Sequence, residues 1–289
     1  MQPGNPFTVV RLWPEQVASP EVFARVLEML RRNRPACDEV WMATARGYPP
    51  LEAHRRYADR LAEAAEALRT ANILPGLQVG NTLGHAHRPE LPTDGTEAQR
   101  MVGHDGASCD TCFCPRSEEF RAYFRALGEI YGSVRPSSIW LDDDMRLNQH
   151  PPVAHGCFCD VCLRAFSAES SRPWSRQALV AALNSPREPA PLRLEWTRFG
   201  ARSLAGLARA FSKGVAASGA DCRVGLQQVG LEWSCHSGPD WAPVLRTMSE
   251  ATGRPAGSRP GHGFYNDHRP RGMIVKALMI ARQNAALPE

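Results

Sequence analysis

Short apolar segments alternate along this chain with longer segments in which apolar residues recur at helical spacing. The short segments have the length and composition of buried strands, and they lie at 7–13, 38–44, 73–80, 137–143, 222–230 and, more weakly, 254–260. The longer segments are amphipathic, as surface helices are, and they lie at 19–33, 50–72, 117–134, 192–219, 239–253 and 272–287. This order predicts a parallel sheet whose strands are joined by helical crossovers.

Two α/β architectures have this order of elements, an open doubly wound sheet and a (β/α)8 TIM barrel. A dinucleotide-binding sheet would carry a Gly-rich turn after its first strand, and none follows 7–13. Long polar loops instead follow three strands, at 81–116, 144–191 and 231–238, and a barrel builds its active site from such loops. We therefore predict one α/β barrel domain over 1–289. Because about six of the eight strands are recognisable, we expect an incomplete barrel, truncated at its C-terminal end.

Composition and charge exclude several classes of protein. The chain has 289 residues, 43% of them hydrophobic and 22% charged, which is typical of a globular protein. The net charge of +4 is spread over intermixed arginines and acids without a basic block, so we expect no nucleic-acid partner. No apolar stretch is long enough for a bilayer, and the N-terminus has no secretion signal. We therefore expect a cytoplasmic protein with no membrane partner, whose cysteines are thiols or metal ligands.

Six of the nine cysteines fall into two triplets, Cys109, Cys112 and Cys114 in "CDTCFC" and Cys157, Cys159 and Cys162 in "CFCDVC". Thiolates are good zinc ligands, and the C-x-C-x2-C spacing lets one loop present three sulfurs to one ion. The residues allow two ligand sets. One pairs Cys109 and Cys112 with Cys159 and Cys162, and the other joins the second triplet to one earlier cysteine. Reduced thiols without a metal are the alternative. We treat 105–170 as a Cys-rich zinc-loop region.

Three consecutive carboxylates, Asp142, Asp143 and Asp144, end the fourth predicted strand in "WLDDDMR". Neighbouring carboxylates raise one another's proton affinity, which suits a general acid. The same run could bind a cation or the hydroxyls of a sugar, or form a solvated loop, and Arg146 offsets part of its charge.

Aromatic and polar residues lie at or after other predicted strand ends and in the Gly-rich segment 259–270. Sugars stack their apolar faces on aromatic rings while nearby polar groups hold their hydroxyls. Seven residues are therefore our candidates for substrate binding: Trp13, Asn81, Arg146, Gln228, Trp233, Tyr265 and His268. His85, His87 and His104 have no spacing that indicates a metal site.

The segment "CFCPRSEEFRAYFRALGEIYG", the following Ile-Trp-Leu-Asp strand and then "CFCDVCLRAF" resemble the β-galactosidases of glycoside hydrolase family 42 and their barrel relatives. The resemblance covers about 105–170. It implies that zinc is bound by Cys114, Cys157, Cys159 and Cys162, with Cys109 and Cys112 outside the site. Four thiolates leave no open position for water, so this Zn2+ would be structural.

The resemblance also implies two catalytic glutamates, the acid/base after strand four and the nucleophile after strand seven. Matching "LDDD" to the family's Val-Asp-Asn-Glu puts Asp144 on the acid/base glutamate, Asp143 on the asparagine and Asp142 on the aspartate. The chain departs from the family here, because an aspartate is one methylene shorter and Asp143 adds a charge. We expect the nucleophile beyond Glu289, with Glu232 as the one other glutamate in a predicted site loop.

The leading hypothesis is a retaining glycoside hydrolase that acts on small-molecule or oligosaccharide glycosides of the β-galactoside type. Without the nucleophile strand, we expect this chain alone to be inactive, and its open sheet edges favour a homo-oligomer. The alternative is a non-catalytic carbohydrate-binding or zinc-stabilised barrel.

Overall fold

The computed structural model describes residues 7–33, 36–85, 88–186, 190–230 and 241–260, with single positions between 274 and 285. Six parallel strands form the main sheet, and their spatial order is their order along the chain. They are β1 (Val9–Leu12), β2 (Glu39–Ala43), β3 (Leu74–Val79), β6 (Ser138–Leu141), β9 (Arg223–Gln228) and β10 (Gly257–Pro260). All six predicted strands are confirmed. Within the described residues β1 and β10 are the sheet's edges, so the barrel is incomplete.

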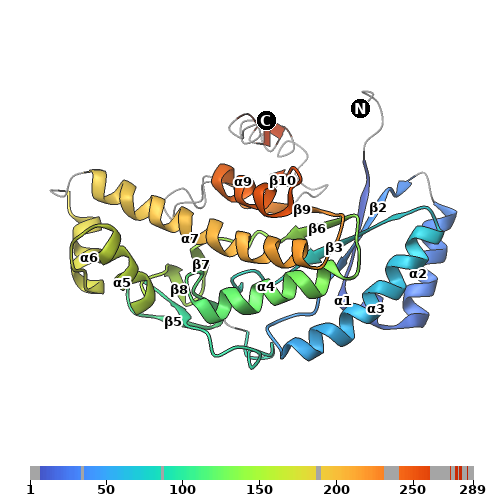
Figure 1. Cartoon of the computed structure of the whole chain (residues 1–289), viewed down its shortest axis with the longest axis horizontal. Coiled ribbons are helices and arrows are strands. Elements are labelled where there is room, and N and C mark those ends of the chain that lie inside the picture. Colours follow the sequence, from blue (N-terminus) through green and yellow to red (C-terminus); the bar gives the residue numbers. More distant parts are fainter. Residues whose placement is uncertain are drawn as a thin grey trace.

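Helices connect these strands and pack along the outside of the sheet (Figure 1). The long ones are α2 (Pro20–Arg32), α3 (Leu51–Thr70), α4 (Glu118–Gly132), α7 (Ala190–Ala217) and α9 (Trp241–Thr252). The short α1 (Pro14–Ala18) directly follows β1, and α3 packs on β3 as α9 does on β9. The helix predicted at 272–287 lies largely outside the described residues. No helix in the described part of the chain has the length and apolarity to cross a membrane.

The strands present two different faces because successive side chains alternate across a strand. The helix-facing side is aliphatic and forms the core with α3, α4, α7 and α9. It comprises Leu12, Val40, Met42, Leu77, Val79, Ile139, Leu141, Val224 and Leu226, all of them buried. The opposite, concave side carries polar and aromatic residues. This division sets which residues at the strand ends can meet a ligand.

Two stacked tryptophans, Trp41 of β2 and Trp140 of β6, fill the middle of the concave face, with ring centroids 4.9 Å apart. They fit because neighbouring strands carry glycine beside them. A Cβ on Gly225 would lie 2.5 Å from the Trp140 ring, and one on Gly76 would lie 2.7 Å from Cδ1 of Trp41. Ser138 accepts a hydrogen bond from Trp140 Nε1 at 2.9 Å.

The long loops after β3 and β6 contain structure that the sequence did not predict. The first holds a two-stranded sheet, β4 (Arg100–Val102) with β5 (Ser108–Phe113). The second holds β7 (Asn148–His150) with β8 (Val153–His155), followed by α5 (Asp160–Glu169) and α6 (Arg176–Asn184). These strands are short and lack an alternating apolar pattern, so period alone could not identify them.

A buried histidine ties α3 to α4. Nε2 of His54 lies 2.8 Å from the Tyr123 hydroxyl, and Nδ1 lies 2.6 Å from the Tyr131 hydroxyl. Tyr123 donates its own proton to the Pro49 carbonyl at 2.6 Å, so it accepts from a protonated Nε2 and leaves Nδ1 as the acceptor for Tyr131. Burial lowers the pKa of His54 from 6.5 to about 4, consistent with this neutral tautomer.

We expect the fold to lose up to about 3 kcal/mol of stability between pH 6.5 and pH 4 through His54. The unfolded chain takes up a proton near pH 6.5, whereas the folded chain takes it up only near pH 4, so acid favours unfolding. Urea unfolding at pH 7.0 and pH 4.5 measures the effect, with His54→Gln as the non-titrating comparison. An equal loss of stability in the two proteins would contradict this assignment.

Candidate functional site

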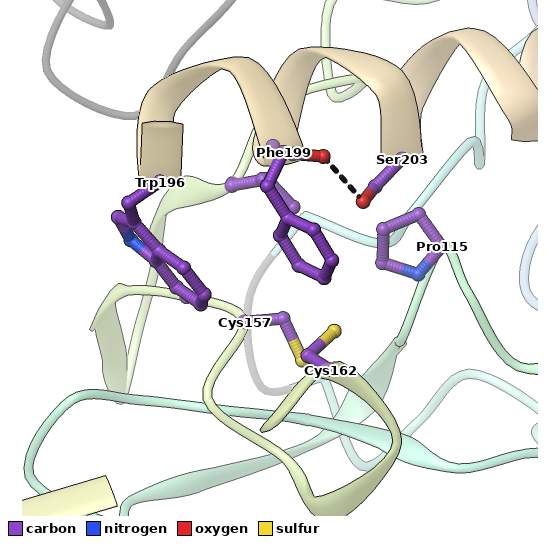
Figure 2. A pocket seen from close by; sticks show the side chains of 9 residues that line it. Pro115, Cys157, Cys162, Trp196, Phe199 and Ser203 are labelled. Carbon is purple, nitrogen blue, oxygen red and sulfur yellow. Dashed lines mark hydrogen bonds between the residues drawn. The ribbon is translucent and has the colours of Figure 1, made fainter. Parts of the chain in front are cut away.

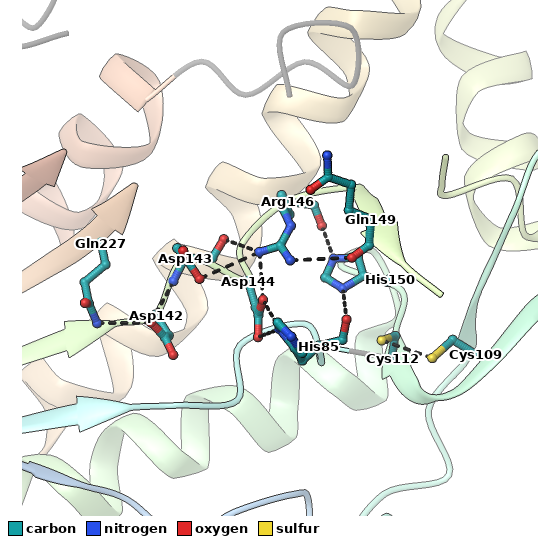
Figure 3. A network of polar contacts seen from close by, with 10 residues as sticks. All are labelled: His85, Cys109, Cys112, Asp142, Asp143, Asp144, Arg146, Gln149, His150 and Gln227. Carbon is teal, nitrogen blue, oxygen red and sulfur yellow. Dashed lines mark hydrogen bonds and ion pairs between the residues drawn. The ribbon is translucent and has the colours of Figure 1, made fainter. Parts of the chain in front are cut away.

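The three aspartates of the acidic run follow β6 directly, at the carboxyl end of the sheet, and their side chains take different directions (Figure 3). Asp142 continues the strand's alternation and stands on the concave side with Trp140. Its backbone N–H still bonds to the Val79 carbonyl of β3 at 3.1 Å, so the sheet positions it. Asp143 and Asp144 lie in the turn beyond.

Asp142 is the carboxyl group whose proton affinity the site most raises. Burial raises its pKa to about 6, and the charges of Asp143 and Asp144 act in the same direction. Its Oδ1 accepts hydrogen bonds from the Asp143 backbone N–H at 3.0 Å and from Gln227 Nε2 at 3.2 Å. A carboxyl with a pKa of about 6 can donate or accept a proton near neutral pH.

Asp143 is half-exposed and lies at the surface of the same turn. Its pKa is raised by burial and by the charge of Asp144, while Arg146, 3.7 Å from its Oδ1, opposes the shift. Asp143 is therefore more exposed to solvent than Asp142.

Asp144 is instead enclosed in the loop layer between the side chains of Arg146 and His85 (Figure 3). Its side chain is 4% exposed and accepts hydrogen bonds from Arg146 Nη1 at 2.7 Å and His85 Nδ1 at 2.8 Å. The hydrogen bond to Asp144 raises the pKa of His85. His150 braces this group beneath, with its ring nitrogens 3.1 Å from the His85 carbonyl and 2.9 Å from the Arg146 carbonyl. The residue that the family resemblance aligns with the catalytic glutamate is therefore held as one member of a buried ion cluster.

The other predicted binding residues divide into several groups. Trp13 is 47% exposed just after β1, at the same end of the sheet as Asp142. The side chain of Asn81, after β3, accepts the Gly47 backbone N–H at 3.0 Å and so fixes a neighbouring loop. Arg146 donates a hydrogen bond to Asp144 and is buried with it. Gln228 lies on the helix-facing side, fully buried, and donates to Ser258 at 2.9 Å. Trp233, Tyr265 and His268, like Glu232 and His87, lie outside the described residues.

The glutamine on the concave face is Gln227, one residue before the predicted Gln228. Because side chains alternate, Gln227 points to the side of Trp140 and Asp142, and its Oε1 accepts from Arg259 Nη1 at 3.0 Å. A one-residue difference in position thus separates a residue of the candidate site from a residue of the core.

Two polar side chains on the concave face were not predicted from the sequence. Gln78 of β3 pairs with Trp140 in the ladder, is fully buried, and neither its amide oxygen nor its nitrogen has a hydrogen-bond partner. The Nε1 of Trp41 is likewise buried without a partner. Each such group costs about 1–3 kcal/mol, which a bound water or polar ligand would offset. Strand alternation places Gln78 beside Ala43 and Trp140, but it does not by itself say which face is the concave one.

The four cysteines Cys114, Cys157, Cys159 and Cys162 are brought together, and all are buried. Their sulfurs lie within 4.8 Å of one another, the arrangement that a tetrahedral ion with Zn–S bonds near 2.3 Å requires. The alternative set, which pairs Cys109 and Cys112 with Cys159 and Cys162, is not formed in the described structure. Cys109 and Cys112 instead face each other, with their sulfurs 3.2 Å apart. The cluster can bind a metal such as zinc.

Local structure explains why these four sulfurs converge. Cys159 is the N-cap of α5 and Cys162 lies in its first turn, so both face the positive end of the helix. Hydrogen bonds from the other three thiols lower the pKa of the Cys159 thiol, which suits a thiolate ligand. Cys114 precedes α4 and accepts the Arg116 backbone N–H at 3.4 Å.

An aromatic wall closes the cysteine cluster from one side (Figure 2). Trp196 and Phe199 of α7 stack at 5.3 Å between ring centroids and cover Cys157 and Cys162. The remaining cavity is about 10 Å³, room for no more than one water molecule. Since no substrate could reach a metal here, the cluster is suited to holding the loop rather than to catalysis.

No protein-family model matches this sequence, and no curated protein matches it. Solved structures do match its fold. The β-galactosidase from Bacillus circulans sp. alkalophilus aligns with a TM-score of 0.61 at 15% identity, over 94% of this chain and 42% of that one. The β-galactosidase from the psychrophilic Marinomonas ef1 aligns with a TM-score of 0.58 at 14% identity, over 84% of this chain and 39% of that one.

A third match is the polyextremophilic β-galactosidase from the Antarctic haloarchaeon Halorubrum lacusprofundi, with a TM-score of 0.53 at 17% identity. It covers 83% of this chain and 39% of the haloarchaeal chain. The chain has the fold of a glycosidase TIM barrel. It spans about two-fifths of the length of these β-galactosidases. The predicted incomplete α/β barrel is therefore confirmed, and the resemblance to β-galactosidases extends beyond 105–170.

Proposed function

We propose that this chain is the sugar-binding part of a glycoside hydrolase acting on β-galactoside-like glycosides, with Asp142 as its proton donor. In this proposal the glycoside lies across the concave face at the carboxyl ends of the strands. Asp142 gives its proton to the glycosidic oxygen while a carboxylate nucleophile, which is not assigned among the described residues, bonds to the anomeric carbon and the bond to the leaving group breaks. The same group would then accept a proton from the attacking water in the second half of a retaining mechanism.

The observation that carries this proposal is the environment of Asp142. It stands where TIM barrels place catalytic groups, and its pKa of about 6 leaves roughly one-tenth of it protonated at pH 7. General acid catalysis of this kind typically accelerates a reaction by about 10²–10⁴-fold. The three β-galactosidases whose structures are described above support the substrate class.

The cysteine cluster supports a structural Zn2+ in this proposal. Four thiolates would complete the coordination of zinc, so the ion would supply no activated water and would act by fixing the fold. It would join the segment before α4 to the start of α5 and so hold the ends of the loops that carry His85 and Asp144.

A second function, sugar binding without turnover, is favoured by one specific observation. Asp144, which aligns with the family's acid/base glutamate, is engaged by Arg146 and His85 and is almost fully buried. A barrel in which Asp144 cannot donate a proton to a substrate could still bind a glycoside on Trp13 and the concave face.

The experiment combines calorimetry with aryl β-galactoside hydrolysis, on the wild type and on Asp142→Asn. We expect the wild type to bind, and any turnover to fall as pH rises through about 6, because the protonated form is the donor. Asp142→Asn should bind but lose about 10²–10⁴-fold in rate. Asp221→Asn, at an exposed carboxylate before β9 that pairs with Arg254, is the matched control and should behave as the wild type.

Turnover would exclude the second function, whereas binding without turnover is expected of both functions for a chain in which no nucleophile is assigned. A wild type that binds no galactoside by calorimetry would contradict both.

A further inference from the structure

Arg11 has an uncommitted guanidinium at the rim of the concave face. It belongs to β1 and pairs with Trp41, so it lies on the side of Trp41 and Trp140. Its Cζ is 3.9 Å from the ring centroid of Trp13, which holds the guanidinium by a cation–π contact. Within the described residues this group makes no hydrogen bond and no ion pair. Its five N–H donors remain free for a ligand.

Other charges converge on the same place from three more strand ends. Arg46, after β2, lies 5.5 Å from the same Trp13 ring and pairs with the exposed Glu15 at 3.2 Å. Arg259 of β10 donates to Gln227, which in turn donates to Asp142. Burial lowers the pKa of Arg11, Asp142 raises it, and Arg259, Asp143 and Arg46 also act on it. Arg11 and Asp142 therefore both lie on the concave side, close enough for their charges to interact.

The protonation state that the proposed reaction needs leaves Arg11 with less negative charge nearby. Asp142 can offset the charge of Arg11 only while it is ionised. In the state that donates a proton Asp142 is neutral, and Arg11 and Arg259 then share Asp143 as their remaining nearby anion. An anionic group on the ligand would restore the balance in that state. A guanidinium that is stacked on an indole ring presents its edge in a fixed orientation, which suits the two oxygens of a carboxylate.

We propose that the sugar recognised here is acidic, a hexopyranoside with an anionic group at C6 such as a uronate, and that Arg11 binds that group. This inference rests on the proposed function and adds its substrate class. A neutral hexose offers hydroxyls, each of which donates and accepts, whereas Arg11 only donates. The anionic group would occupy the rim beside Trp13, with the glycosidic bond directed toward Asp142.

The test is calorimetric titration of the whole chain with methyl β-D-galactoside, methyl β-D-galactosiduronate and methyl β-D-galactoside 6-sulfate. We expect at least one acidic sugar to bind about tenfold or more tightly than the neutral one, and the two acidic probes identify whether the group is a carboxylate or a sulfate. Arg11→Gln should weaken acidic-sugar binding by about 10–100-fold and change neutral-sugar binding less than about twofold. Arg11→Lys should bind the acidic sugar with an affinity between those of the wild type and Arg11→Gln, because lysine keeps the positive charge but cannot make two parallel hydrogen bonds to one anionic group.

Arg209→Gln, which removes an exposed partner of Glu250, is the matched control and should bind as the wild type does. Thermal unfolding of each variant separates loss of binding from loss of fold. Equal binding of neutral and acidic sugars by the wild type, or an equal loss of both in Arg11→Gln, would overturn the inference and leave the proposed function standing. A wild type that binds none of the three would overturn both.

Discussion

Replacing Asp144 by asparagine is expected to destabilise the fold by about 3–5 kcal/mol, the usual cost of removing one partner from a buried ion pair. The side chains of Asp144 and Arg146 are 4% and 7% exposed, so the buried guanidinium would keep only the half-exposed Asp143, at 3.7 Å, as a counter-charge. His85 would lose the carboxylate that raises its pKa. Denaturant unfolding of the wild type and of Asp144→Asn measures the difference in the free energy of unfolding.

Asp143→Asn is the matched control, since it makes the same chemical change one residue away. Asp143 is half-exposed and 3.7 Å from Arg146, so solvent screens the pair and we expect a change under about 1 kcal/mol. The family alignment makes the opposite prediction for Asp144. If Asp144→Asn kept wild-type stability and lost only turnover, Asp144 would be the proton donor and our assignment of that role to Asp142 would be wrong.

The second large effect concerns the cysteine cluster. We expect about one zinc per purified chain, and we expect Cys159→Ser to lose the metal and much of the stability of the Cys-rich region. Structural zinc contributes about 10–16 kcal/mol of binding free energy in small zinc domains, and this free energy stabilises the folded state. Cys159 is buried and shares its site with three other thiols, so a serine there would leave an incomplete ligand set. Elemental analysis and thermal unfolding, each with and without a chelator, give the two readouts.

Cys109→Ser is the control for this experiment. Its thiol lies in the neighbouring pair with Cys112, so the variant should keep its zinc. Loss of zinc from Cys109→Ser would favour the other ligand set that the residues allow, in which Cys109 and Cys112 pair with Cys159 and Cys162. A wild type that is folded and free of zinc would contradict the metal site altogether.

The sequence by itself determined the strands of the main sheet and the long helices between them, and it reduced the cysteine cluster to two possible sets. Apart from β10, each strand of the main sheet is an apolar run with a helical segment after it. Both signals are local, so 7–13 and 222–230 could be recognised without knowing their neighbours. The C-x-C-x2-C spacing is also local. It sets the cysteines from Cys157 to Cys162 around the start of a helix, and the resemblance supplied Cys114 as the fourth.

Only the tertiary structure decided which residues could serve the candidate site. Strand alternation separates Gln227 from Gln228, yet which of the two faces is concave depends on where the helices pack. Beyond a strand's end, alternation no longer applies, and the direction of a side chain follows from contacts with distant segments. Asp144 is buried because His85, 59 residues earlier, and Arg146 surround it, whereas Asp142 stays on the ladder with β3. Three identical residues in a row therefore take three different roles for reasons that no local pattern contains.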